Sequence, residues 1–282
     1  MMKHMNLNLR LLFTFLTVAL FITSCSTNDE PVENEEQQQD YSEVSSSAEV
    51  DEASAIMDDI SIEVYETQEA IDTGRSASNF NLPDCVTITV VIEQNYREIT
   101  IDFGTDGCVV RGNVLKGKII LSYTRDPAAQ TVFITKTLED FYFNVLSLEG
   151  GKTILKEHSN ENGNPQFTKT SSLTITWPSG RSASREGTRI REWIEGHGSG
   201  VWSDNVFEIT GNWSTTFVNG NTHSYEVILP LRREVICFFF VSGSIDVERT
   251  NFGGVFDYGE GDCDNMATFT FNNGEVVDII LN

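Results

Sequence analysis

Three of the four histidines lie in loops or next to turns, where a catalytic side chain could reach a substrate. His158 lies in a polar loop, and His223 follows an Asn-Gly turn. His197 lies in Trp193–Gly200, which also contains an acid and a serine, but not in the Gly-x-Ser-x-Gly order of a nucleophile elbow. The chain has no His-x-x-x-His metal pair and no phosphate-binding glycine loop. The sequence therefore assigns no catalytic residue, and a secreted hydrolase is only a second alternative.

An acidic, glycine-rich loop near the C-terminus is a candidate cation site. It carries four closely spaced carboxylates: Asp257, Glu260, Asp262 and Asp264. Asp102 and Asp106 partly repeat the pattern. Calcium takes six to eight oxygen ligands, and such a loop supplies several. The loop lacks the EF-hand register, however, and acids with glycine are also the composition of an ordinary β-turn. We favour the turn and keep calcium as the one cofactor to consider.

The tryptophans form a third candidate site, because all four fall within one short part of the chain: Trp177, Trp193, Trp202 and Trp213. Exported β-proteins commonly hold glycans by stacking tryptophan rings on the sugars. The competing interpretation is that these rings fill the core, which is where tryptophan is more often found. Glycan binding requires two or more of them on one exposed face.

Four cysteines are available for disulfides: Cys85, Cys108, Cys237 and Cys263. An even number in an exported chain favours disulfides, with three possible pairings. The segments 102–108 and 257–263 resemble each other, and each follows another cysteine by a similar interval. We therefore predict the pairs Cys85–Cys108 and Cys237–Cys263, within two related modules, 85–123 and 237–282. Each closure would add roughly 3–4 kcal/mol of stability.

The N-terminus has the pattern of a secretory signal. A short basic start precedes the apolar run Leu11–Ile22, which at 12 residues is shorter than the roughly 20 needed to cross a bilayer. Ile22-Thr23-Ser24-Cys25 resembles the lipobox of bacterial lipoproteins, in which the cysteine is acylated after cleavage. We expect residues 1–24 to be the signal peptide and Cys25 to join the chain to outer-membrane lipid.

The residues after Cys25 refine this location. Asp29 and Glu30 resemble the acidic export signal that sends Bacteroidetes lipoproteins to the cell surface. Surface exposure is therefore the expected location, with a periplasm-facing position as the alternative. A surface position would make an extracellular glycan or protein the partner of the chain.

The acidic residues are concentrated near the N-terminus. The chain has 42 Asp+Glu, 19 Lys+Arg and a formal net charge of −23, which counts against nucleic acid as a partner. Residues 29–72 contain 16 acids and no base, whereas 75–282 contain 26 acids and 17 bases. Since like charges repel, we expect residues 25–48 to form a disordered acidic tether. The body that follows would carry a net charge of only −9.

A helix is predicted after the tether, over residues 49–74. Apolar residues recur there at spacings of three and four: Val50, Ala53, Met57, Ile60, Val64 and Ile71. The segment 60–65 also alternates like a strand, but we favour the helix. It would either dock on the body or stand as a stalk.

Residues 75–282 read as an all-β body. Short β-branched runs such as 86–90, 99–103 and 118–123 are separated by Gly-Gly and Asn-Gly turns that suit hairpins. No long helical pattern interrupts them, so parallel βαβ units are not expected. We predict an antiparallel meander of about a dozen strands. The sequence does not separate a sandwich, a barrel and a single curved sheet.

Several of these segments together resemble an uncharacterised family of Bacteroidetes lipoproteins. The resemblance covers about 80–282 and is carried by turns, cysteines and strand starts: 101–108, 116–120, 193–196, 257–259 and 263–265. It implies an outer-membrane location and no catalytic residue. The sequence as a whole predicts a lipid-anchored protein of binding or structural type.

Overall fold

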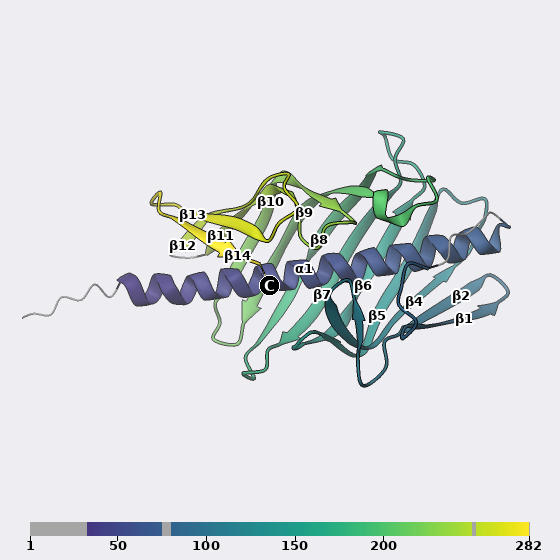
Figure 1. Cartoon of the computed structure of the whole chain (residues 1–282), viewed down its shortest axis with the longest axis horizontal. Coiled ribbons are helices and arrows are strands. Elements are labelled where there is room, and N and C mark those ends of the chain that lie inside the picture. The colour runs from purple at the N-terminus through teal and green to yellow at the C-terminus, as the bar shows by residue number, and fades with distance from the viewer. Residues whose placement is uncertain (1–32, 75–79, 250–251, 282) are drawn as a thin grey trace, which may run out of the picture.

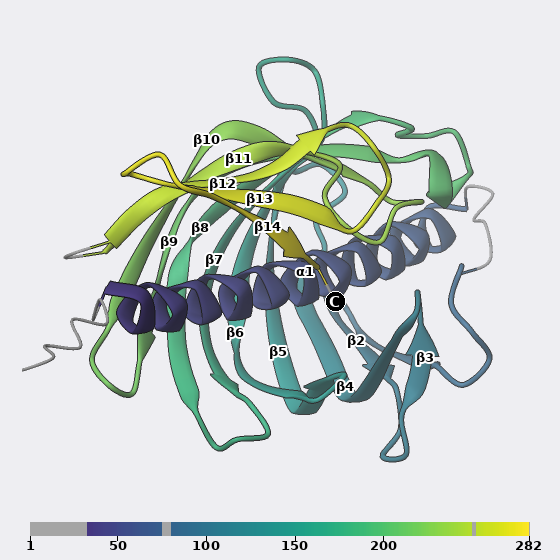
Figure 2. The same ribbon diagram turned by 60° about the vertical axis from the view of Figure 1, so that its left-hand side comes forward.

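The computed structural model describes residues 33–74, 80–249 and 252–281, in which one long helix lies along the concave face of one curved antiparallel sheet (Figures 1 and 2). The segment expected to be a signal peptide, 1–24, and Cys25 lie outside the described residues. The strands follow in chain order: β1 (Thr87–Glu93), β2 (Tyr96–Asp102), β3 (Cys108–Val110), β4 (Asn113–Thr124), β5 (Thr131–Phe143), β6 (Leu146–Glu157), β7 (Gln166–Thr176), β8 (Ser182–Glu195), β9 (Val206–Phe217), β10 (Thr222–Glu234), β11 (Ser242–Arg249), β12 (Phe252–Glu260), β13 (Met266–Phe271) and β14 (Val276–Ile280).

The sheet is a meander in which successive strands pair antiparallel. The one exception is β3, which pairs with β4 beside the main path, so that β2 also pairs with β4. The predicted all-β antiparallel class is confirmed, and of the arrangements left open the structure shows a single curved sheet. Its edge strands are β1 and β14, which do not pair with each other among the described residues. Figure 2 shows β10–β14 arching over the helix opposite β4–β6.

The helix α1 (Glu33–Asp72) begins sixteen residues before the predicted start at 49, within the segment expected to be a tether. The sheet surrounds it so closely that every residue from 50 to 65 is buried, the acids included. Val50, Met57 and Ile60 join the larger of two apolar clusters, with side chains from β2 to β9. Ala48 and Ala55 face a second cluster built from β9 to β14. The helix is therefore the centre of the fold, and its acids between residues 50 and 65 are buried and not solvated.

Both predicted disulfides are present. Cys85 is bonded to Cys108 and Cys237 to Cys263. The resemblance between the two flanking segments is also visible in the backbone. The carboxylate of Asp102 accepts a hydrogen bond from Gly104 N at 2.8 Å, as Asp257 does from Gly259 N at 2.7 Å.

The two disulfide-bonded regions meet beside the helix. Gly112, in the turn after β3, lies against the ring of Phe238, so that a Cβ at Gly112 would be 3.6 Å from that ring. Phe238 is the neighbour of Cys237, and its carbonyl accepts a hydrogen bond from Arg233 at 2.7 Å. The two ends of the curved sheet are thus held near each other by loops that each contain a disulfide.

Candidate functional site

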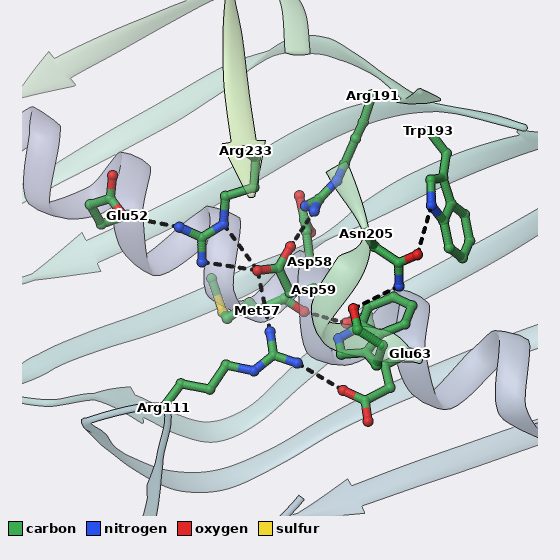
Figure 3. Close-up of polar contacts among 12 residues, drawn as sticks. Glu52, Met57, Asp58, Asp59, Glu63, Arg111, Arg191, Trp193, Asn205 and Arg233 are labelled. Carbon is green, nitrogen blue, oxygen red and sulfur yellow. Dashed lines mark hydrogen bonds and ion pairs between the residues drawn. The ribbon is translucent and has the colours of Figure 1, made fainter. Parts of the chain in front are cut away.

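Acids in the buried part of α1 are paired with bases from the sheet and its loops, and Figure 3 shows the arginines around Asp59. Asp58 accepts hydrogen bonds from Lys136 at 2.7 Å, Lys169 at 2.9 Å and Lys152 at 3.1 Å. Burial alone would raise the pKa of Asp58, but the three ammonium groups hold it well below its usual range. The same burial lowers the pKa of Lys169 to about 7, against the attraction of Asp58.

Asp59 is the centre of a second cluster, made of arginines. Its carboxylate pairs with Arg191 of β8, with Arg233 of β10 at 2.9 Å and with Arg111 at 3.2 Å. Burial opposes ionisation, but these guanidinium groups lower the pKa of Asp59 to about 2. Arg111 also donates to Glu63 at 2.8 Å (Figure 3). The cluster joins three distant parts of the sheet to one turn of the helix.

This pairing separates the charges of the molecule in space. The structure describes 16 of the 17 Lys and Arg of residues 75–282, and at least twelve of these contact α1 through a hydrogen bond or ion pair. None of the 26 acids in the same range is buried. The net charge of −9 therefore understates how acidic the outside of the body is, because most of its bases are turned inward.

The best candidate for a binding site is a cavity at the C-terminal end of α1. It has a volume of about 740 Å³ and is open to solvent on one side. The last two turns of α1 form its floor, and three loops form its rim: 125–130 between β4 and β5, 158–165 between β6 and β7, and 196–205 between β8 and β9. The third loop contains the short 3-10 helix Trp202–Asp204. A rim made of loops on a rigid sheet is a common setting for a binding site.

One wall of the cavity is aromatic. Trp193 packs edge-on against His197, with ring centroids 4.8 Å apart, and against Trp202 at 5.7 Å. The indole N–H of Trp193 donates to Asn205 at 3.0 Å and to the Glu195 carbonyl at 2.8 Å, which fixes the ring. The indole Nε1 of Trp202 is buried and has no hydrogen-bond partner among the described residues. The wall therefore offers ring surface, most of it from Trp202 and His197, because Trp193 is only 5 % exposed.

The helical side of the cavity, formed by the end of α1, is polar and held in place by ion pairs. Glu66 of α1 pairs with Lys156, whose ammonium lies 4.8 Å from the centre of the Tyr65 ring. Glu69 accepts hydrogen bonds from Tyr123 at 2.8 Å and Arg125 at 3.0 Å. Burial, and next the nearby acids of α1, raise the pKa of Tyr65, so its hydroxyl stays protonated. These contacts leave a neutral-to-acidic surface facing the aromatic wall.

The structure brings together some of the residues singled out in the sequence and separates others. His158, His197, Trp193 and Trp202 all line the cavity. His223 is fully buried elsewhere, 3.1 Å from the Tyr225 hydroxyl. Ser199 donates to Asp204 at 3.0 Å and to the Val201 carbonyl at 3.2 Å, so it is not bonded to a histidine.

The other two tryptophans belong to the interior. Trp177 is 9 % exposed and lies under the guanidinium of Arg181, 4.7 Å from the ring centre. Trp213 is 4 % exposed, stacks on Tyr225 and lies under Arg189 at 3.6 Å. Trp193 is buried to the same degree, at 5 % exposure, so only the half-buried Trp202 keeps accessible ring surface and the four tryptophans do not share an exposed face. Trp193 and Trp202 line the cavity at the end of α1, and Trp213 lines a separate pocket.

The acidic C-terminal loop forms turns. Asp257 accepts a hydrogen bond from the backbone of Gly259, and Asp264 accepts one from Met266 N at 2.9 Å. In the described part of the chain, no group of three or more His, Cys, Asp or Glu side chains is arranged to hold a metal ion. Glu260 and Asp262 are exposed. The geometry thus favours the turn interpretation of this loop.

Sequence reasoning missed the helical side of the cavity. Tyr65, Glu66 and Glu69 lie in the segment expected to be a stalk or a surface helix, and their pattern alone does not reveal a cavity. Within the described residues, no helix is both long and apolar enough to span a membrane. Comparison with protein-family models, with curated proteins and with solved structures gives no match for this chain. The function must therefore be inferred from the geometry itself.

Proposed function

We propose that the chain is a lipid-anchored binding protein of the outer membrane, and that the cavity at the end of α1 is its ligand site. The lipobox-like residues ending at Cys25 support the anchor. The single observation that carries the binding role is the cavity, whose volume of about 740 Å³ lies within the range typical of ligand pockets, roughly 300–1,000 Å³.

The ligand class that fits this cavity best is a neutral saccharide. A sugar presents apolar C–H faces to aromatic rings, and hydroxyl groups to polar side chains around them. The half-buried Trp202 and the exposed His197 supply ring surface, and Trp193 packs behind them. The exposed side chains of His158 and His197 stand on the rim. The acids Glu66 and Glu69 disfavour an anionic ligand.

The course of α1 supports a cavity that faces away from the membrane. Cys25 precedes the start of the helix at Glu33 by only eight positions, which an extended chain covers in about 30 Å. The helix then runs through the body, and residues 47–72 extend over about 40 Å at 1.5 Å per residue. The anchor and the cavity would therefore lie at opposite ends of the body.

Binding is tested on the purified full chain by retention on immobilised polysaccharides, followed by titration calorimetry with the oligosaccharide of the retained polymer. We expect His197→Ala and Trp202→Ala each to weaken retention at least tenfold. Phe133→Ala is the control, because Phe133 is 67 % exposed on β5 and does not line the cavity. The proposal fails if no polysaccharide is retained, or if the cavity variants bind as well as the control.

The anchor is tested separately. Labelled fatty acid should be incorporated into the wild-type chain in cells and not into Cys25→Ala. Protease added to intact cells should degrade a surface-exposed chain and spare a periplasm-facing one. Labelling of the Cys25→Ala chain at the wild-type level would exclude this anchor.

A further inference from the structure

The first strand, β1, is an edge of the sheet and lacks the features that usually prevent an edge strand from pairing with another chain. It pairs with β2 over seven consecutive residues with no shift in register, so no bulge twists it away. It contains no lysine or proline, and six of its seven residues are uncharged. Native proteins normally protect edges with such features, because an unpaired row of backbone groups can accept another strand. No strand pairs with the outer side of β1 among the described residues.

Apolar side chains accompany this free edge. Ile92 is 56 % exposed and Val91 is 41 % exposed, next to Tyr96 at the start of β2. Burying them against a second strand would remove apolar surface from water at roughly 25 cal/mol per Å². A second strand could therefore both pair with the backbone groups on the outer side of β1 and bury apolar side chains.

We propose that β1 is the interface through which two copies of this chain pair, edge to edge and antiparallel. A two-fold axis at Val90 places Ile88 of one copy opposite Ile92 of the other, and Thr89 opposite Val91. The same register places Glu93, the only charged residue of β1, opposite Thr87 and not opposite a second carboxylate. The strand is therefore complementary to itself in both apolar character and charge.

The charge distribution of the body favours β1 over the rest of the surface as the place where two copies can meet. None of its 26 acids is buried, while at least 12 of the 16 bases that the structure describes contact α1. Two such surfaces repel each other except where a stretch carries almost no charge, and β1 is such a stretch. The opposite edge, β14, does not qualify, because antiparallel self-pairing about its centre would bring the two Asp278 carboxylates together.

The expected dimer is weak in solution. A pair of seven-residue strands buries less than the roughly 1,200–2,000 Å² of a stable complex. Two chains held on one membrane would meet at a much higher effective concentration. The pairing itself does not depend on the proposed anchor, and its test is carried out on the solubilised full chain.

Sedimentation equilibrium of the full chain between 1 µM and 1 mM tests the pairing. We expect the mass to rise from monomer to dimer across this range, and Ile92→Lys to weaken the association at least tenfold. The matched control is Val276→Lys, which places the same charge at a side chain of equal exposure, 56 %, on the edge β14. A chain that is monomeric at 1 mM would overturn the proposal, and so would an association that Ile92→Lys leaves unchanged.

A second measurement fixes the register. Under mild oxidation Val90→Cys should form a covalent dimer, because directly opposed residues in an antiparallel pair have Cβ atoms about 4.5–5.5 Å apart. Val276→Cys should remain monomeric under the same conditions. Equal cross-linking of the two variants would show non-specific edge contact and would contradict the two-fold arrangement.

Discussion

Lys136 of β5 donates a hydrogen bond to Asp58 of α1 across 2.7 Å, although the two residues are 78 positions apart in the sequence. Both side chains are buried, and Lys152 and Lys169 bind the same carboxylate. One carboxylate of the helix is therefore shared by lysines from three neighbouring strands. Buried ion pairs between lysines of the concave face and acids of the helix therefore help to hold the helix against the sheet.

Replacing Asp58 by Asn should be strongly destabilising. The amide keeps the shape of the carboxyl but removes the negative charge that three buried lysines share. Removing one partner of a buried ion pair typically costs 3–5 kcal/mol. Urea unfolding followed by circular dichroism measures the free energy of unfolding. Asp126→Asn, at an exposed position in the loop after β4, serves as the control and should change stability by less than about 0.5 kcal/mol. Similar small losses for both variants would contradict the role of Asp58.

Glu52 should make the protein less stable as the pH rises. Burial raises the pKa of this carboxyl to about 8, against the attraction of Arg233. The folded state thus binds its proton more tightly than the unfolded chain, whose pKa is near 4.5. The contribution of Glu52 to stability should fall between pH 4.5 and 8, by at most about 1.4 kcal/mol per pH unit, and level off above 8. Urea unfolding at a series of pH values measures this slope. Glu52→Gln should remove this contribution, and an unchanged slope in the variant would assign the effect to another group.

Much of the sheet could be predicted from local signals, because turns and cysteines act over short distances. The Asn-Gly pairs at 219–220 and 273–274 mark chain reversals, and the similarity of 102–108 to 257–263 identifies the disulfide pairs. The structure corrects one detail: Gly150 and Gly151 lie inside β6 and do not form a turn. Their missing side chains allow close approach of the neighbouring strands, since a Cβ at Gly151 would be 2.5 Å from the Lys136 carbonyl oxygen.

The buried position of α1 could not be predicted in the same way. A run of acids repels itself in isolation, and the bases that balance it lie far along the chain. One signal was nevertheless present. In β5 the inward positions are Val132, Ile134 and Lys136, so the lysine continues an apolar alternation. Lys152, Ile154 and Lys156 do the same in β6. Lysines in the inward register of adjacent strands indicate an internal acidic partner, and this rule would also have located one wall of the cavity.

Removing the Cys85–Cys108 disulfide by a double change to serine should lower the free energy of unfolding by about 3–4 kcal/mol, since it closes a loop of 23 residues. Removing Cys237–Cys263, with a separation of 26, should cost a similar amount. The two losses should not be additive, because Phe238, next to Cys237, contacts the turn after β3. A double-mutant cycle in urea measures the coupling. Strict additivity would show that the two loops act independently.

Gly117 should be among the least replaceable glycines of the sheet. It has φ = +75° at the irregularity between Lys116 and Lys118, where β4 faces Asp140 of β5. A Cβ there would lie 2.1 Å from the Asp140 carbonyl oxygen, so Gly117→Ala adds a backbone clash to the strain of a left-handed conformation. We expect a loss of about 3 kcal/mol or more.

Gly163→Ala measures the cost of the left-handed backbone conformation alone, without the steric clash expected at Gly117. Gly163 has φ = +84°, close to that of Gly117, but an added Cβ would meet nothing within 4 Å. Its replacement should therefore cost only the roughly 1–2 kcal/mol of the left-handed conformation. Thermal and urea unfolding of the two variants measure the difference. If both lost the same amount, β4 and β5 would have to move apart at Asp140 without penalty, which the unbroken pairing from Lys118 to Tyr123 argues against.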